Sequence, residues 1–162
     1  CKPKVLIAAE PPTALDVTLQ AQILRLLREL QETEGTAVML ISHDIGAIAS
    51  VAHDIAVFYA GRIVESGPAE RVLRRPAMPY TQALLNALPA ADKDHLEAIA
   101  GQPPDLSKPF EGCAFAPRCR HRFERCVQEP GLLPVEDRHS AACWLAEEAT
   151  LPRAAGTPPS PR

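Results

Sequence analysis

Residues 4–16 read KVLIAAEPPTALD, and residues 37–44 read AVMLISHD. Each stretch contains a short apolar run, VLIAA or AVMLI, of the kind that forms a strand buried on both faces. Polar residues follow each run, Glu10 after the first and His43 after the second. Because α/β sheets bind ligands at the carboxyl ends of their parallel strands, we predict that Glu10 and His43 lie at that edge.

Helices are expected beside these strands. Asp16 is a typical N-cap residue, and Gly35 is a typical helix stop. Between them apolar residues recur at helical spacing, at Leu19, Ile23, Leu27 and Leu30. A second, short helix is predicted from about Ile45 to Ala52.

The next segment has the pattern of a hairpin followed by two helices. Residues 55–59 and 62–65 are strand-like and flank Ala60-Gly61, where Gly61 supplies the positive φ of a turn. Short helices are expected over about 69–75 and 80–87. This order predicts an α/β fold with parallel strands and an antiparallel extension.

Composition narrows the class of protein. The 162 residues carry a formal net charge of −3, which disfavours non-specific nucleic-acid binding, so we expect no nucleic-acid partner. No uninterrupted apolar stretch is long enough for a membrane-spanning helix. Prolines become frequent after residue 102, which predicts a boundary there, and the stretch from Leu151 is expected to be disordered.

Four motifs together resemble one known family. They are AEP at 9–11, TALD at 13–16, SHD at 42–44 and YAGRIVESG at 59–67. In this order they are similar to the second half of an ATP-binding cassette (ABC) ATPase, specifically the ATP-binding subunit of oligopeptide and dipeptide importers. The resemblance implies the C-terminal part of a P-loop NTPase core, containing the Walker B strand, the D-loop and the switch histidine.

The resemblance also implies roles for individual residues. Glu10 would be the general base or water-positioning carboxylate, and His43 would hold the γ-phosphate and the attacking water. Asp16 would communicate across an ATPase dimer. ATP and Mg²⁺ are the implied cofactors, but Ala9 stands where the family has its Mg²⁺-associated Asp, and a methyl group binds no metal. Pro12 also departs from the family, which usually has Thr, Ser or an aliphatic residue there.

Two further family motifs do not occur in the 162 residues. These are the phosphate-binding loop Gly-x-x-x-x-Gly-Lys-Ser/Thr and the sequence Leu-Ser-Gly-Gly-Gln. In the family both precede the Walker B strand, so we expect this chain to be a C-terminal fragment. By itself it is predicted not to hydrolyse ATP.

The importer resemblance continues downstream. MPYTQALL at 78–85, GQPP at 101–104 and GCAFAPRC at 112–119 are similar to the C-terminal extension of peptide importers, with Met78 replacing the usual His. We therefore divide the chain into an ATPase portion at 1–75, an extension at 76–146 and a disordered tail at 147–162.

The extension carries four cysteines spaced C-x5-C-x6-C-x16-C, namely Cys113, Cys119, Cys126 and Cys143. Soft thiolate ligands suit an iron–sulfur cluster or zinc. The spacing lacks the tight pairs of structural zinc sites and so favours a cluster, while free or disulfide-bonded thiols are a third reading. The family resemblance implies a 4Fe-4S cluster. Four arginines among the cysteines are expected to lower the thiol pKa values.

Two functional hypotheses follow. The first is an ATP-binding and ATP-hydrolysing subunit that powers peptide import, working with a second ABC ATPase subunit and membrane permease subunits. It would lie peripherally on the cytoplasmic face of the bacterial inner membrane. The alternative is a non-catalytic iron–sulfur or zinc-binding module, regulatory or dimerising, on a degenerate ABC scaffold.

Overall fold

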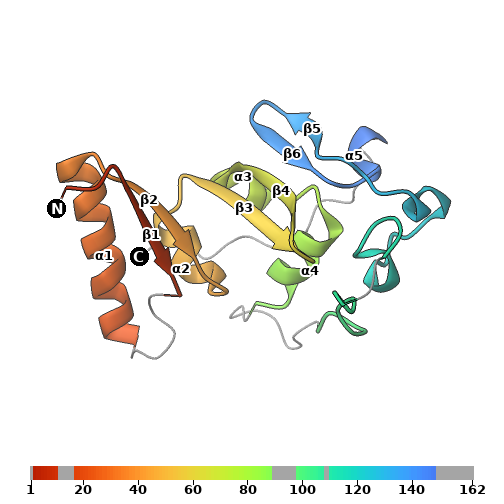
Figure 1. Ribbon diagram of the computed structural model, residues 1–162, viewed down its shortest axis with the longest axis horizontal. Coiled ribbons are helices and arrows are strands. Elements are labelled where there is room, and N and C mark those ends of the chain that lie inside the picture. Colours follow the sequence, from red (N-terminus) through yellow and green to blue (C-terminus); the bar gives the residue numbers. More distant parts are fainter. Residues whose placement is uncertain (1, 11–16, 89–97, 108–109, 149–162) are drawn as a thin grey trace. The chain divides into compact units, whose positions relative to one another are not determined.

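The structure, a computed structural model, describes residues 2–10, 17–88, 98–107 and 110–148 (Figure 1). It consists of two compact units, residues 1–52 and 53–162, which we describe separately. The division at residues 75 and 146 remains a prediction. No helix in the described ranges has both the length and the apolar character to span a bilayer.

The first unit is a strand–helix–strand–helix segment. Its elements are β1 (Val5–Ala9), α1 (Val17–Glu34), β2 (Ala37–Ile41) and α2 (Ile45–Val51). The two strands pair in parallel, from Val5 opposite Ala37 to Ala9 opposite Ile41. Gly35 ends α1 in the left-handed conformation, with φ 64°. All four elements were predicted, with boundaries within about a residue.

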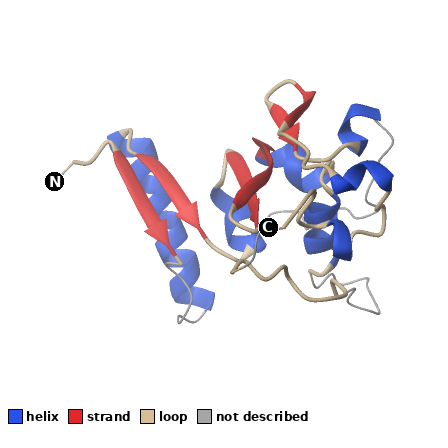
Figure 2. Ribbon diagram, turned by 45° about the vertical axis from the view of Figure 1, so that its right-hand side comes forward, coloured by secondary structure: helices blue, strands red, loops and turns tan. Residues whose placement is uncertain are grey.

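Burial of these strands differs from the prediction. Figure 2 shows α1 running along one face of the strand pair. Because successive side chains of a strand point to opposite faces, every second residue lies on the face away from α1. That face is exposed. Its apolar members are exposed by roughly half or more: Val5 56%, Ile7 63%, Met39 54% and Ile41 49%. The expectation of strands buried on both faces is therefore wrong for the described chain, which contains only this pair of parallel strands.

The second unit is built on an antiparallel sheet in the order β3-β4-β6-β5. Its strands are β3 (Asp54–Tyr59), β4 (Arg62–Pro68), β5 (Leu133–Glu136) and β6 (His139–Ala141). Its helices are α3 (Ala69–Arg74), α4 (Pro79–Asn86) and α5 (Leu145–Glu148), with two 3₁₀ turns at Ala116–Arg118 and Glu124–Val127. The predicted β3–β4 hairpin is confirmed, and both of its turn residues, Ala60 (φ 51°) and Gly61 (φ 76°), are left-handed.

Strands β5 and β6 were not predicted. They have only four and three residues, and β5 contains Pro134, which removes a backbone donor. They return the chain to β4, where Ala141 pairs with Glu65. The core of this unit contains three aromatic rings, those of Tyr59, Tyr80 and Phe115, whose centroids are 4.5–5.5 Å apart. Buried Met78 and Ala141 belong to the same core.

Candidate functional site

Glu10 and His43 meet at the carboxyl ends of β1 and β2. His43 Nδ1 lies 2.9 Å from Glu10 Oε2. Both side chains are accessible, with exposed fractions of 74% for His43 and 42% for Glu10. Their predicted juxtaposition at this edge of the strand pair is observed, and both groups are accessible to solvent or a ligand.

The backbone at Glu10 is in an unusual conformation. Its N–H continues the parallel ladder by donating to Ile41 O at 2.8 Å, but its φ is 49°, in the left-handed region. A side chain other than glycine adopts that region at a cost of about 1 kcal/mol or more, and such strain concentrates at functional sites. The strained backbone fixes where the carboxylate projects from the end of β1.

Asp44, the residue after His43, is held by several hydrogen bonds. Asp44 caps α2: its Oδ1 accepts from Ala47 N at 3.1 Å, while Gln20 Nε2 of α1 donates to its Oδ2 at 2.6 Å. Ser42 Oγ accepts from Asp44 N at 3.0 Å. The hydrogen bond from Ala47 N is the main reason that the pKa of Asp44 is lowered from 3.8, and Gln20 adds to it. Sequence reasoning missed the contact with Gln20.

Other predicted residues of this site are placed less fully. Ala9 ends β1, directly before Glu10, so the position of the family's metal-associated Asp carries only a methyl group here. Asp16 and Pro12 lie outside the described residues. The structure therefore brings together Glu10 and His43 of the predicted nucleotide site.

The four cysteines of the second unit line one pocket. Cys113, Cys119, Cys126 and Cys143 are all free thiols, and the pocket is completed by apolar and aromatic side chains, among them Met78, Phe115 and Trp144. His121 also lines it. His139 is 2% exposed and hydrogen-bonded to Glu65.

The electrostatics of this pocket correct one prediction. Burial raises the pKa values of the Cys113 and Cys119 thiols, and that of Cys143 to about 11, and neighbouring cysteines raise them further. Two of the four arginines expected to lower these pKa values are engaged elsewhere. Arg118 donates to the carbonyls of Ile99 and Ala100, and Arg125 pairs with Glu147. The pocket therefore favours the protonated form of these three thiols.

Backbone donors nevertheless face three of the sulfurs. Cys113 accepts from the amides of Phe115 and Ala116, Cys119 from that of His121, and Cys143 from that of Leu145. The pocket that the cysteines help to line has a volume of only about 10 Å³. Within the described ranges, no three His, Cys, Asp or Glu side chains converge closely enough to hold a metal ion.

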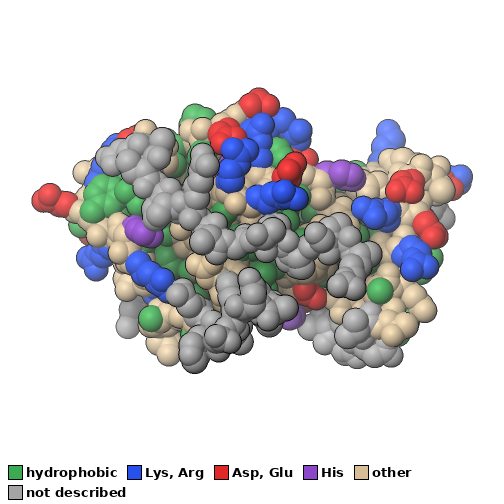
Figure 3. Space-filling model, turned by 180° about the vertical axis from the view of Figure 1, so that it is seen from behind, with side chains coloured by type: hydrophobic (Ala, Val, Ile, Leu, Met, Phe, Trp, Pro, Cys, Tyr) green, Lys and Arg blue, Asp and Glu red, His purple; other side chains and the backbone are tan. Residues whose placement is uncertain are grey.

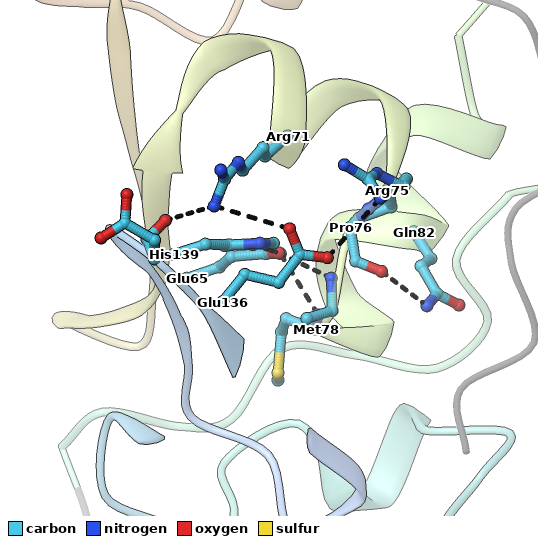
Figure 4. A network of polar contacts seen from close by, with 10 residues as sticks. Glu65, Arg71, Arg75, Pro76, Met78, Gln82, Glu136 and His139 are labelled. Carbon is cyan, nitrogen blue, oxygen red and sulfur yellow. Dashed lines mark hydrogen bonds and ion pairs between the residues drawn. The ribbon is translucent and has the colours of Figure 1, made fainter. Parts of the chain in front are cut away.

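Sequence reasoning missed a buried acid–histidine pair beside this pocket. Glu65 is 0% exposed and His139 is 2% exposed, and His139 Nε2 lies 2.7 Å from Glu65 Oε1 (Figure 4). Glu65 also accepts from Ala77 N and Met78 N. Only the isolated position of an acid in an apolar strand, IVES, signals such a site in the sequence.

Charges elsewhere are mixed in sign. On the face drawn in Figure 3, basic and acidic side chains are interspersed. In the second unit, Arg71 and Arg75 lie 3.5 and 3.6 Å from Glu136, and Arg138 lies 2.7 Å from Asp54. These pairs leave the basic side chains compensated rather than gathered into one surface.

Comparison with known proteins agrees with the motifs. Residues 64–126 match the family described as the C-terminal region of oligopeptide/dipeptide transporters. The oligopeptide transport ATP-binding protein OppD of Haemophilus influenzae is 44% identical over 150 residues, covering 91% of this chain and 46% of that protein. The dipeptide transport ATP-binding protein DppD of Escherichia coli is 48% identical over 146 residues, covering 88% and 45%.

A third relative, the dipeptide transport ATP-binding protein DppD of Bacillus subtilis, is 45% identical over 151 residues, covering 91% of this chain and 45% of that protein. The chain thus spans about half the length of the curated relatives it matches. The similarity covers both the unit with Glu10 and His43 and the unit with the cysteines. Residues 64–126 therefore match the C-terminal region of the oligopeptide/dipeptide transporter family, and most of the chain is similar to the ATP-binding proteins of oligopeptide and dipeptide transport.

Proposed function

We propose that this chain contributes part of the ATP-hydrolysing site of a subunit that powers peptide import. The observation that carries the proposal is the 2.9 Å contact between Glu10 and His43 at the ends of adjacent parallel strands, in a chain similar to ATP-binding proteins of peptide transport. A second ABC ATPase subunit and membrane permease subunits are its proposed partners. It would act peripherally at the cytoplasmic face of the membrane.

The two side chains have complementary tasks in phosphoryl transfer. The Glu10 carboxylate accepts a hydrogen bond from a water molecule and orients it for in-line attack on the γ-phosphorus of ATP. His43 donates a hydrogen bond to a γ-phosphate oxygen or to that water. The cap formed by Asp44, Ala47 and Gln20 holds the residue next to His43 in place before the reaction, so no reorganisation energy is needed there during phosphoryl transfer.

Magnesium binding is the weak part of this site. Mg²⁺ would neutralise charge on the β- and γ-phosphates, but it takes oxygen ligands, and Ala9 offers none from its side chain. The donor set at this position therefore does not fit the ion, and we derive no step through it. A phosphate-binding loop would also have to come from residues other than these 162.

Peptide uptake tests the proposal. In cells that carry the gene for this chain, Glu10→Gln is expected to reduce uptake of labelled dipeptides at least 100-fold, because the amide cannot act as a base. Glu32→Gln, an exposed acid on α1, serves as the matched control and is expected to leave uptake unchanged. Unimpaired uptake in both Glu10→Gln and His43→Ala would show that neither residue is catalytic.

We further propose that the four-cysteine pocket holds a soft metal cofactor, with a 4Fe-4S cluster as first choice and zinc as the alternative. Four sulfurs around one pocket and backbone N–H donors on three of them suit bridged, anionic thiolate ligands. Binding must widen the present 10 Å³ cavity.

Anaerobic reconstitution with iron and sulfide tests this second proposal. The 162-residue chain is expected to gain broad visible absorption, and Cys119→Ser is expected to lose most of it. Cys1→Ser is the control, because Cys1 lies outside the four-cysteine motif. Stoichiometric zinc with no bound iron would favour the zinc site, and no retained metal of either kind would exclude both.

The alternative function, a non-catalytic cofactor-binding module, is favoured by Ala9 and by the missing phosphate-binding loop in these residues. It predicts that Cys119→Ser reduces metal loading while Glu10→Gln leaves peptide uptake unchanged. The uptake and reconstitution experiments together therefore distinguish the two functions.

A further inference from the structure

The cysteine pocket is assembled from distant parts of the chain. Cys113, Cys119 and Cys126 come from one local segment, whose ends are joined by a hydrogen bond from Cys113 N to Cys126 O at 3.0 Å. Cys143 follows β6, and Met78 precedes α4. Something must hold these two residues against the three-cysteine segment.

Glu65 contacts both of these parts. Its carboxylate accepts from Ala77 N at 2.6 Å and from Met78 N at 3.2 Å, and it lies 2.7 Å from His139 Nε2. In Figure 4 the carboxylate lies between the His139 ring and the Met78 backbone, and the Met78 thioether points away from the polar groups. The Met78 side chain, 2% exposed, lines the cysteine pocket.

The connection to Cys143 runs through β6. His139 is the first residue of β6, and Cys143 lies four residues further on. Between them Ala141, with no exposed surface, pairs with Glu65, and Ala142 N donates to Val64 O at 2.8 Å. The strand that delivers the fourth cysteine is thus held by the backbone of β4 and by the Glu65 side chain.

Gly67 makes this close approach possible. A Cβ at that position would lie 3.0 Å from Arg138 O and 3.1 Å from both Cα and Cδ2 of His139. A larger residue would push the histidine away from β4. Strand β4 therefore presents both the acid and the space that the histidine needs.

A buried carboxylate is costly unless every oxygen is satisfied, and apolar residues often pack in its place at less cost. Glu65 has three partners from two separate segments, and both segments supply walls of the same pocket. We propose that Glu65, held by His139, is a positioning residue that brings Cys143 and Met78 to the three-cysteine segment. This rests on the proposed cofactor site for its purpose, but the positioning itself is testable without a cofactor.

The test is residue-resolved alkylation of the metal-free 162-residue chain with iodoacetamide, read by mass spectrometry. In Glu65→Gln an NH₂ group replaces one carboxylate oxygen, so not every group that contacts the carboxylate, namely Ala77 N, Met78 N and His139 Nε2, keeps an acceptor. Cys143 is therefore expected to react about tenfold faster than in the parent chain. Cys126, held within the local segment, is expected to react at an unchanged rate. A general loosening of the fold would accelerate all four cysteines together.

Glu136→Gln is the matched control, because the Glu136 side chain pairs with Arg71 and Arg75 and bonds to neither Met78 nor His139, although Glu136 lies opposite His139 in the β5–β6 pair. An unchanged Cys143 rate in folded Glu65→Gln, or an equal change in Glu136→Gln, overturns the positioning role. If Glu65→Gln does not fold, His139→Gln replaces it with the same expected selectivity for Cys143.

Reconstitution separates this inference from the proposed cofactor. If Glu65→Gln exposes Cys143 but the parent chain binds neither iron–sulfur nor zinc, the positioning role stands and the proposed cofactor fails. If the parent chain loads and Glu65→Gln loads equally well, with Cys143 still protected, the cofactor stands and the positioning role fails.

Discussion

The two units of the chain distribute their apolar residues in opposite ways. In residues 1–52 the strand pair is covered on one face only, and Ile7 remains 63% exposed. In residues 53–162 an antiparallel sheet and the extension enclose a core in which Met78 and Phe115 are each 2% exposed. The first unit presents Glu10 and His43 at accessible strand ends, whereas the second unit buries Cys143 and partly buries its other three cysteines.

This difference affects how each site responds to change. The Glu10–His43 pair depends on local backbone geometry and one helix cap. The cysteine pocket depends on long-range packing between β4, β6 and the cysteine segment. Substitutions in the second unit are therefore expected to have larger effects than equivalent substitutions in the first.

The largest effect is expected at Gly112. It has φ 74°, and a Cβ there would lie 2.5 Å from Cys126 O and 2.7 Å from Val127. Gly112→Ala is expected to lower the free energy of unfolding of the second unit by about 3 kcal/mol, because both strain and overlap oppose the added methyl. Denaturant unfolding followed by fluorescence of Trp144, the only tryptophan, measures this.

Gly131→Ala is the control for that measurement. Nothing lies within 4 Å of a Cβ at Gly131, so its effect is expected to stay within about 0.5 kcal/mol. Equal unfolding midpoints for the two variants would mean that the close approach at Gly112 does not stabilise the cysteine segment.

The two methionines provide a direct comparison of the units. Met78 is 2% exposed and Met39 is 54% exposed. Met78→Ala is expected to cost about 3 kcal/mol through lost burial and a residual cavity, and Met39→Ala less than about 1 kcal/mol. Unfolding of the first unit is followed by circular dichroism of α1. A similar cost at both sites would show that the open face of the strand pair is covered in solution.

Alkaline pH is expected to weaken the second unit selectively. The pKa of Cys143 is raised from 9.0 to about 11, mainly by burial, so the folded state keeps its proton after the unfolded chain has lost it. The contribution of Cys143 to the free energy of unfolding of the metal-free chain is therefore constant below about pH 9 and falls between 9 and 11. Cys143→Ala removes that part of the decline, and an unchanged alkaline profile in that variant contradicts the assignment.

The sequence predicted local elements well and long-range ones poorly. Strand and helix boundaries in residues 1–52 followed from apolar runs and from Gly35, which act within a few residues. The parallel pairing also followed, because a strand–helix–strand unit leaves few alternatives. Strands β5 and β6 were missed since they are short and depend on long-range pairing: β6 pairs with β4, some 70 residues earlier, and β5 pairs with β6.

The candidate sites divide in the same way. The meeting of Glu10 and His43 was predictable because both follow strands that pair in parallel. The spacing of the cysteines predicted a site, but it did not predict the raised thiol pKa values. These depend on burial and on which groups the neighbouring arginine side chains contact in the folded chain. Glu65 and His139 are 74 residues apart, and no local pattern connects them.

The smallest effect is expected at Asp44, and it has the opposite dependence on pH. Its folded pKa is lowered below 3.8, chiefly by the hydrogen bond from Ala47, so its stabilisation is present above that pH and is lost as pH falls through the folded value. Asp44→Ala is expected to destabilise the first unit by about 1 kcal/mol at pH 7, as for other N-caps. Asp44→Asn retains a capping oxygen, so it should lower the free energy of unfolding at pH 7 by less than Asp44→Ala does. Because the amide does not titrate, it should also make that free energy less dependent on pH in the acid range, as measured by circular dichroism of α1. Because Asp44 also holds the loop that carries His43, a profile identical to that of the parent chain would mean that the cap is not formed in solution, and the histidine would then lack its proposed support.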